Sequence, residues 1–177
     1  MLEKIIFLDF DVPVTNRLTA LATGSAFELN PLIIRILNNI CAASGAKIVC
    51  SSNRAPLKNE VEIKNLLQKS GLNMEHLHED WTCSYETTYK SDKGEAAAVR
   101  ADNIKRWLAA HPGVDYVAID DLPLDLPHFV HITDINNGVS FENIQKVCAL
   151  LSIDLNDVTK AANPKAPRFK FPAYNPQ

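Results

Sequence analysis

Short apolar runs alternate along the chain with segments in which apolar residues recur at helical spacing. The clearest runs lie at 4–8, 47–50, 116–119 and 129–132, with a weaker one near 74–77. These runs are shorter than typical helices, as expected for strands that are buried on both faces of a parallel sheet. The alternation of strand and helix predicts an α/β fold with a mostly parallel central sheet.

The helical segments carry recognisable caps. They are expected over about 30–45, 60–70, 102–110 and 140–151. Asn30 is a good cap residue, Pro31 suits the first helical position, and Gly45 suits the end of the segment. Because the connections are long enough for crossovers, helices are expected on both faces of the sheet, which gives a three-layer fold.

Two internal stretches lack a clear pattern. Residues 14–29 predict a loop over the strand ends, and residues 72–98 predict a small insert or hairpin. We expect one domain over residues 1–155 that includes this insert, followed by a Pro-rich tail at 156–177. From Asn163 on, this tail is expected to lack regular structure unless it docks against the domain. No repeat is visible.

Composition sets limits on the class of protein. The 177 residues are 46% hydrophobic and 22% charged, with a formal net charge of −3, which is ordinary for a globular protein. A negative net charge gives no general attraction to nucleic acid or membrane, so any site for a polyanion has to be local.

The cysteines and the apolar runs suggest a compartment. The four cysteines are widely spaced and form no C-x-x-C pair, which predicts reduced thiols in a cytoplasmic protein. No amino-terminal signal pattern and no apolar stretch near 18 residues occurs, so no membrane span is expected. Secretion without such a signal would leave no trace in the sequence.

Polar side chains follow three of the predicted strands at the point where each strand ends. Asp9 and Asp11 follow the first strand, the segment Ser51–Arg54 follows the second, and Asp120 and Asp121 follow the run at 116–119. The carboxyl ends of parallel strands open into the crevice where ligands bind in α/β folds. Grouped carboxylates favour a hard divalent cation, and an added hydroxyl and cation can bind a phosphate. Each pair of aspartates alone is equally consistent with a simple turn.

This order of motifs resembles the haloacid dehalogenase-like (HAD) phosphohydrolase superfamily, and within it the small, minimally capped branch that includes phosphatase domains of polynucleotide and RNA repair enzymes. The stretch F-L-D-F-D is similar to the first family motif. The resemblance implies a Rossmann-like HAD fold, with Asp9 as the nucleophile that forms an aspartyl phosphate and Asp11 as the general acid and then base.

The resemblance also implies roles for the other polar clusters. In K-I-V-C-S-S-N-R, similar to the second motif, Ser51 would bind the transferring phosphoryl oxygen and Ser52, Asn53 and Arg54 would line the substrate side. In Y-V-A-I-D-D, similar to the fourth motif, Asp120 and Asp121 would complete a Mg²⁺ site. The remaining Mg²⁺ ligands would be the Asp9 carboxylate and the Asp11 carbonyl.

The third motif is a basic residue just ahead of a helix, and two residues compete for it. Arg100 precedes the helix expected from Asp102, whereas Lys93 lies in the expected insert. Lysine is the commoner family choice, but the position of Arg100 favours it over Lys93, and arginine offers a planar fork where lysine is a point charge.

One departure from the family pattern follows Asp11. The family usually has glycine and then threonine or valine there, whereas this chain has Val12 and Pro13. Glycine adopts backbone conformations that a β-branched residue adopts poorly. This departure keeps open a catalytically silent module that binds a phosphorylated partner. A receiver-like domain that accepts phosphate on an aspartate is a third reading.

The expected activity is that of a Mg²⁺-dependent phosphomonoesterase. No gap between the motifs can hold a large cap domain, and an open site favours macromolecular substrates. Phosphorylated protein side chains, such as phosphotyrosine, and phosphorylated nucleic-acid ends are the leading options, and the net charge favours the former over long nucleic acid. The substrate and the oligomeric state stay open.

Overall fold

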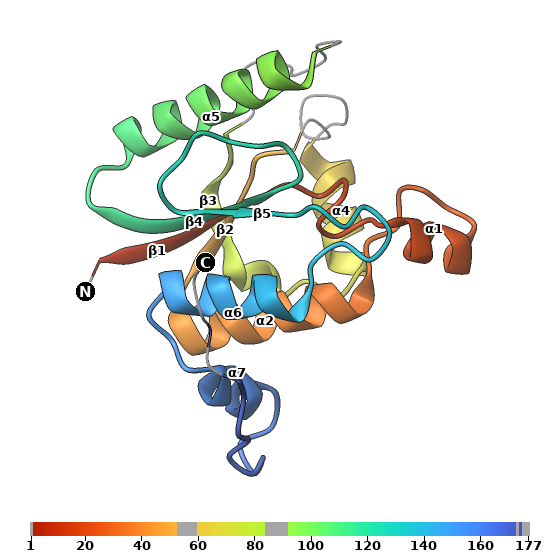
Figure 1. The fold of residues 1–177 in the computed structure, drawn as a ribbon, viewed down its shortest axis with the longest axis vertical. Coiled ribbons are helices and arrows are strands. Elements are labelled where there is room, and N and C mark those ends of the chain that lie inside the picture. The colour runs from red at the N-terminus through yellow and green to blue at the C-terminus, as the bar shows by residue number, and fades with distance from the viewer. Residues whose placement is uncertain (1, 53–59, 84–91, 173, 175–177) are drawn as a thin grey trace.

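The computed structural model describes residues 2–52, 60–83, 92–172 and 174 of the chain. Its strands form one parallel sheet in the order β3-β2-β1-β4-β5 (Figure 1). The strands are β1 (Glu3–Leu8), β2 (Lys47–Cys50), β3 (Leu77–Thr82), β4 (Val114–Asp120) and β5 (Phe129–His131). The α/β class and the parallel sheet expected from the hydrophobic pattern are thus confirmed.

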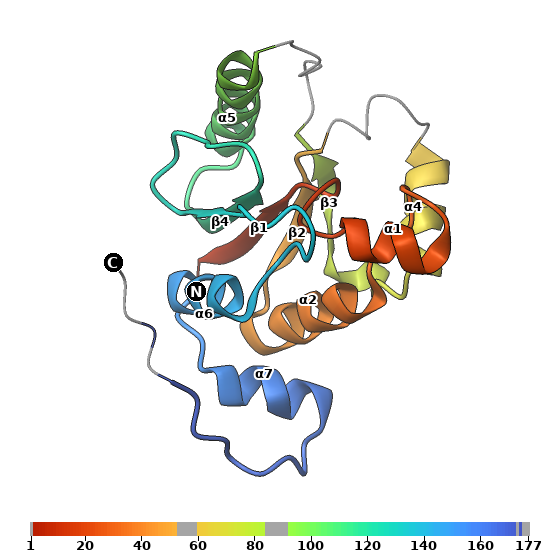
Figure 2. The ribbon, with the colours of Figure 1, turned by 45° about the vertical axis from the view of Figure 1, so that its right-hand side comes forward.

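Helices cover both faces of this sheet. They are α1 (Arg17–Thr23), α2 (Pro31–Ser44), α4 (Glu60–Lys69), α5 (Lys93–Ala110), α6 (Phe141–Leu150) and α7 (Leu155–Ala162), with a 3-10 turn η1 (Met74–His76). Helix α5 lies on one face, and α2 and α6 lie on the other (Figures 1 and 2). Helix α7 packs on the outer side of α2. The described chain therefore has the three layers that the sequence predicts.

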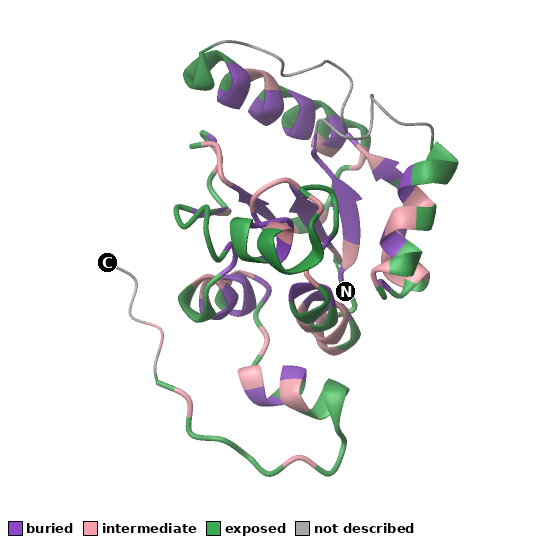
Figure 3. Cartoon of the chain, turned by 90° about the vertical axis from the view of Figure 1, so that its right-hand side faces the viewer, coloured by how far each residue is buried: buried purple, intermediate pink, exposed green. Residues whose placement is uncertain are grey.

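The central strand β1 is buried on both faces. Ile6 and Leu8 belong to the apolar core shared with α2 and α6, whereas Ile5 and Phe7 belong to the core under α5. Successive side chains of a strand point to opposite faces, so a run without polar residues fits only a strand covered on both sides. Figure 3 shows this burial concentrated in the strands and in the inner sides of the helices.

Helix α5 is anchored to the sheet by Trp107. Its ring is fully buried and meets the Phe7 ring edge to face, with 5.3 Å between ring centroids. The indole N–H donates to the Asp80 carbonyl over 3.0 Å. A buried Trp usually finds a partner for its N–H in this way. The helix is thereby held against both β1 and β3.

Several element predictions are confirmed. Helix α2 begins after Asn30, whose side chain accepts from the Leu32 N–H, and ends before Gly45 in the left-handed region. Helix α6 begins after Ser140, which forms a reciprocal capping box with Asn143. Local capping chemistry was therefore a sound guide to these boundaries.

All four cysteines are buried free thiols, in agreement with the reduced state that their spacing predicts.

The loop predicted over 14–29 was partly wrong, because residues 17–23 form α1. Asn16 caps this helix by accepting from the Thr19 N–H, and Gly24 ends it in the left-handed region. Thr19 is the buried residue of the helix, while Leu18 and Leu21 are exposed. A helix that buries no apolar stripe has no hydrophobic periodicity to detect.

The helix expected from Asp102 begins nine residues earlier, at Lys93. Asp92 caps it by accepting from the Gly94 and Glu95 N–H groups. Its first turns bury alanines, among them Ala96, Ala97 and Ala101, instead of bulky residues. Small side chains allow close packing but produce a weak hydrophobic signal, so the sequence showed only the second half of the helix.

The strand predicted near 74–77 was also misplaced. Residues 74–76 form η1, and the strand β3 follows at Leu77–Thr82. Its sequence L-H-E-D-W-T contains charges that point outward from an edge strand, so it lacks an apolar run. Together with the start of α5, it places parts of the expected insert at 72–98 in the sheet and the helix layer.

The segment after α6 holds one helix that the sequence pattern did not indicate, α7. After α7, residues 163–172 have no helix or strand, but they contact the domain. The Gln145 side chain donates to the Pro172 carbonyl over 2.7 Å, and the Phe169 N–H donates to the Asn156 side chain over 2.8 Å. Nowhere in the described ranges is there a helix with the length and apolar character needed to cross a membrane.

Candidate functional site

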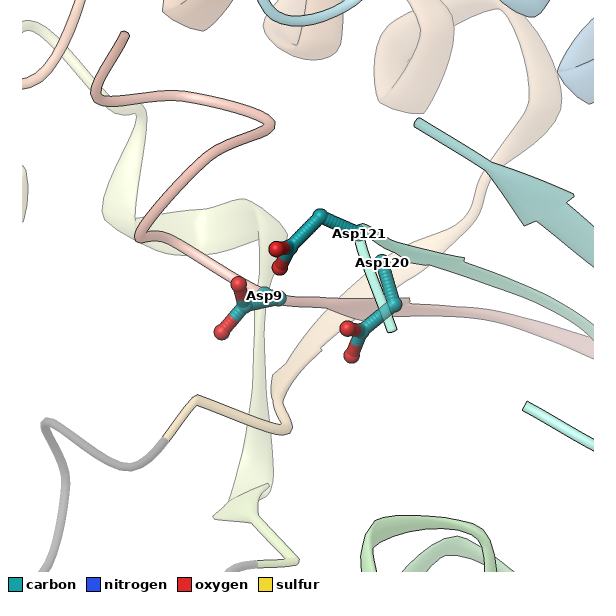
Figure 4. Close-up of side chains that lie close together, drawn as sticks. All are labelled: Asp9, Asp120 and Asp121. Atoms are coloured by element: carbon teal, nitrogen blue, oxygen red, sulfur yellow. The ribbon is translucent and has the colours of Figure 1, made fainter. Parts of the chain in front are cut away.

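Three carboxylates meet at the carboxyl edge of the sheet. Asp9 follows β1, Asp120 ends β4, and Asp121 comes next (Figure 4). Oxygens from all three lie within 4.8 Å of one another. Asp9 is 1% exposed and Asp120 is fully buried. The parallel ladder explains the convergence, since the Asp9 N–H donates to the Ile119 carbonyl over 3.0 Å and so ties the ends of β1 and β4 together.

Arg100 lies between the two buried carboxylates. Its Nη1 donates to both oxygens of Asp120 over 2.8 and 2.9 Å and lies 3.1 Å from Asp9 Oδ1. Arg100 is itself buried, at the third turn of α5. A buried charge needs such partners, because removing one would leave an uncompensated ion. The pair of acids and the guanidinium form one charged unit.

Burial dominates the protonation of this unit. It raises the pKa of Asp9 from 3.8 to about 8, although the Arg100 charge lowers it, and the neighbouring Asp120, Asp11 and Asp121 raise it further. Burial likewise raises the pKa of Asp120, against the lowering effect of Arg100. The pKa of Arg100 is raised above its ordinary value, since the attraction of Asp9 and Asp120 outweighs its own burial. The cost of burial therefore outweighs the stabilisation that one guanidinium gives to the ionised acids.

The segments after β1 and β2 bring three further polar groups to the same edge. The Asp11 N–H donates to Asp9 Oδ2 over 3.3 Å, and Ser52 Oγ donates to Asp11 Oδ2 over 3.4 Å. Ser51 Oγ is buried and forms no hydrogen bond within the described part of the chain. A buried hydroxyl without a protein partner is a candidate donor to a ligand.

The remaining predicted site residues differ in where they lie. Lys93 is the exposed first residue of α5. Seven residues separate it from Arg100, about 10 Å along a helix axis. The geometry thus brings Arg100, and not Lys93, between Asp9 and Asp120. Asn53 and Arg54 lie outside the described residues.

The loop after Asp11 closes without glycine. Among the non-glycine residues that the structure describes, only Ser152 has a positive φ. Val12 and Pro13 therefore do not adopt the left-handed conformation that glycine favours. Thr15 closes the turn: its N–H donates to the Phe10 carbonyl over 2.9 Å, and its hydroxyl donates to the Phe10 and Asp11 carbonyls. The conformational reason for glycine at this position is therefore absent from this chain.

Gly138 packs closely against the backbone of the same loop, and the sequence did not indicate this contact. An added Cβ at Gly138 would lie 2.7 Å from the Pro13 carbonyl oxygen and 2.9 Å from that of Val12, and its φ is +73°. Asn16 also donates to the Asn137 carbonyl over 2.9 Å. The dipeptide Asn137-Gly138 is a local turn signal, but its contact with residues 12–13 spans more than a hundred residues and has no sequence signature.

The sheet order, the minimal helical layers and the acidic edge together define a HAD-like domain. The family model for the HAD domain in Swiss Army Knife RNA repair proteins matches residues 5–143. The chain belongs to this family, as the motifs at Asp9, Ser51 and Asp120 indicated. The family places the chain in a superfamily of phosphohydrolases, whose members typically use Mg²⁺.

Searches of the curated proteins and of the solved structures found no match to the chain.

The raised pKa of Asp9 predicts how pH acts on the metal-free protein. Asp9 keeps its proton up to about pH 8 when folded but ionises near its ordinary pKa of 3.8 when unfolded. The folded state binds more protons in this window, so its free energy of unfolding should fall as pH rises from about 5 to 8. Urea denaturation in EDTA measures this fall, and Asp9→Asn should remove the part due to Asp9.

The same proton should compete with a divalent cation. Added Mg²⁺ should raise the melting temperature more at pH 8 than at pH 6, because binding requires the ionised carboxylate. A Mg²⁺ effect that is equal at both pH values, or that survives in Asp9→Asn, would contradict this assignment.

The contact at Gly138 predicts a stability difference between two matched variants. Gly138 and Gly45 have φ values of +73° and +74°, but an added Cβ at Gly45 would have no atom within 4 Å. Both alanine variants should lose about 1–2 kcal/mol of unfolding free energy from left-handed strain. Gly138→Ala should lose at least about 1 kcal/mol more, since the Pro13 carbonyl must move. Equal losses in urea denaturation would show that the contact is unimportant.

Proposed function

We propose that the chain is a Mg²⁺-dependent phosphomonoesterase that acts on phosphorylated nucleic-acid ends through an aspartyl phosphate. The observation that carries this proposal is the buried unit of Asp9, Arg100 and Asp120, with Asp11 beside it. Phosphoryl transfer to a carboxylate requires an anionic nucleophile, charges that offset the phosphate, and a proton donor for the leaving oxygen.

The donor set fits a magnesium ion. Carboxylate oxygens are the ligands that Mg²⁺ prefers, and Asp9, Asp120 and Asp121 offer one each within 4.8 Å. Burial, and to a lesser extent the neighbouring carboxylates, raise the pKa of Asp9, and a divalent cation would offset this cost of ionising it. When bound, the ion would neutralise phosphate charge and help align the reacting group.

In the first step, one Asp9 carboxylate oxygen attacks phosphorus and the bond from phosphorus to the leaving oxygen breaks. Asp11 gives its proton to that oxygen, so the alcohol leaves neutral. The Asp11 side chain also accepts from Ser52 over 3.4 Å, which orients the carboxyl. Ser51 Oγ, buried beside the strand end, would donate to a phosphoryl oxygen.

In the second step, Asp11 is ionised and takes a proton from water. The oxygen of that water bonds to phosphorus as the bond to Asp9 breaks, which releases inorganic phosphate and restores both carboxyl groups. Asp11 therefore alternates between donor and acceptor. It is less buried than Asp9, so solvent reaches it between the steps.

Arg100 lowers the pKa of Asp9 against the effect of burial and would aim its carboxylate during the attack. Its Nη1 alone lies 3.1 Å from the Asp9 carboxylate and 2.8 Å from that of Asp120, so one guanidinium nitrogen contacts both acids. Lys93, exposed at the start of α5, would act only if it reached the phosphate from the rim.

The substrate class is inferred from the family and from the small size of the segment between Asp11 and Ser51. The family description names RNA repair proteins, which favours a phosphorylated nucleic-acid end over a phosphoprotein despite the net charge of −3. Between Asp11 and Ser51 the chain forms only α1 and α2 as helices, too little for a large cap. The described residues of this segment leave no room for a large cap, which favours a polymer end as the substrate.

A silent phosphate-binding module is the competing function. Its motivation was the missing glycine after Asp11, and the turn closed by Thr15 removes that motivation. Phosphate release from phosphorylated oligonucleotides, phosphopeptides and nucleotides, measured with and without Mg²⁺, separates the two functions. Mg²⁺ binding without phosphate release would favour the silent module.

Replacing the nucleophile tests the mechanism. Asp9→Asn should lower the rate of p-nitrophenyl phosphate hydrolysis by at least about 10³-fold, because the amide is not a nucleophile for phosphorus. The variant should keep its circular dichroism spectrum and its melting transition. A retained rate in the folded variant would rule out an aspartyl phosphate at this residue.

Comparing the two cations tests their roles. Arg100→Ala should abolish activity and cost about 3–5 kcal/mol of stability in EDTA, because Asp9 and Asp120 then lack their buried partner. Arg100→Lys should recover stability more than rate, since lysine keeps the charge but loses the fork. Lys93→Ala should leave the unfolding free energy within about 0.5 kcal/mol. A rate loss confined to Lys93→Ala would transfer the phosphate role to Lys93.

A further inference from the structure

A cavity opens beside Asp11. It has a volume of about 310 Å³ and is lined by Asp11, Val12, Thr15, Asn16, Arg17, Ala20, Ala26 and Ile135. This volume lies at the lower end of the range of about 300–1,000 Å³ for small-molecule pockets. Asp11 is the proposed proton donor to the leaving oxygen, so the leaving group of the substrate must lie next to this pocket.

The walls of this pocket are held in place by backbone contacts. The Arg17 N–H donates to the Ile135 carbonyl over 3.4 Å, and the Leu18 N–H donates to the Asn136 carbonyl over 3.2 Å. The Gly138 contact with Val12 and Pro13 fixes the same two segments. The pocket is therefore formed before a ligand binds, which lowers the entropic cost of binding.

The lining combines a cation with small apolar side chains. Arg17 is exposed, and no carboxylate of the described residues lies within ion-pair distance of it. A guanidinium free to fork is suited to a phosphate, which it can bind through two hydrogen bonds. Ala20 and Ala26 leave the space that a larger side chain would fill.

Exposed apolar side chains follow two of the lining residues, Ala20 and Ala26, in the sequence. Leu21 on α1 is 82% exposed, and Phe27, which follows Ala26, is 62% exposed. A protein surface that exposes large apolar groups beside a cation suits single-stranded nucleic acid, whose bases stack on apolar and aromatic faces while its backbone meets the charge.

We propose that this pocket binds the leaving group as the terminal nucleoside of a single-stranded polynucleotide, with Arg17 on the first internal phosphodiester. The proposal rests on the phosphatase function above and adds the group that makes a polymer end a better substrate than a mononucleotide. A phosphopeptide has no phosphodiester next to its phosphate, so Arg17 gives it no corresponding contact.

The test compares ribodinucleotides that carry one terminal phosphomonoester, at the 5′ end in one arm and at the 3′ end in the other, with mononucleotides bearing the same phosphate. In wild-type protein with Mg²⁺, kcat/KM should be higher for one of the dinucleotides than for the mononucleotide that bears the same phosphate. Arg17→Gln should lower the dinucleotide to mononucleotide ratio about tenfold, chiefly through KM. Arg35→Gln, an exposed arginine on α2, should leave the ratio unchanged.

A second pair of variants tests the cavity without changing charge. Ala20→Leu should fill the pocket and lower the ratio of kcat/KM for the dinucleotide to that for acetyl phosphate, whose leaving group is too small to reach it. Ala22 lies on the same helix but outside the pocket lining, so Ala22→Leu should leave this ratio unchanged. Activity with acetyl phosphate shows in each case that the variant is folded.

Binding separates this proposal from the phosphatase function. In Asp9→Asn protein, Arg17→Gln should weaken dinucleotide binding about tenfold and reduce the slope of log affinity against log salt by about 0.7, the value for one single-strand phosphate contact. Hydrolysis with no effect of Arg17→Gln or Ala20→Leu would overturn the pocket assignment alone. A preference for a phosphotyrosyl peptide would overturn both the pocket assignment and the proposed nucleic-acid substrate, but not the phosphatase activity. Arg17-dependent binding without any hydrolysis would overturn the phosphatase function alone, and the absence of both would overturn both.

Discussion

The structure depends on a buried arginine shared by two buried carboxylates. Asp9 and Asp120 terminate neighbouring strands, and the parallel ladder brings them to one point whether or not the charges are compensated. Burial makes the ionised forms costly, as the raised pKa of Asp9 indicates. Arg100 reduces that cost because α5 crosses the same face and delivers a guanidinium within 3.1 Å of both acids. The fold and the chemistry thus impose the same requirement, which is that α5 lie close over β1 and β4.

The sequence predicted the parts of the fold that carry local signals. Buried strands such as β1 and β2 have apolar runs, and α2 and α6 have caps and bulky inner faces, so both kinds of element were found. Helix α1 and the first half of α5 bury polar or small residues, and β3 is a charged edge strand. Their positions are set by tertiary contacts that produce no period in the sequence.

The residues of the candidate site could also be predicted only in part from the sequence. The residues Asp9, Asp11, Ser51 and Asp120 could be named because strand ends are readable and parallel strands share an edge. The choice between Arg100 and Lys93 depended on where α5 begins. The helix begins at Lys93, the position where the motif pattern expects the basic residue. In the structure, however, Arg100 is the cation that lies between the two acids. The part played by Gly138 and Thr15 could not be foreseen, since it depends on a loop path after Asp11 that the family pattern does not describe. The roles of all these side chains in catalysis stay predictions.

Helix α5 carries both the charge at the acidic edge and the aromatic anchor that packs on Phe7 of β1. Arg100 and Trp107 are seven residues apart, so they project from the same side of the helix. Trp107 rests on Phe7, which points to the same face of β1 as Asp9. The tryptophan ring therefore acts as a spacer that sets the height of the guanidinium above the sheet. Evolution could adjust the reactivity of Asp9 by resizing an aromatic contact two turns of helix away, without altering any charged residue.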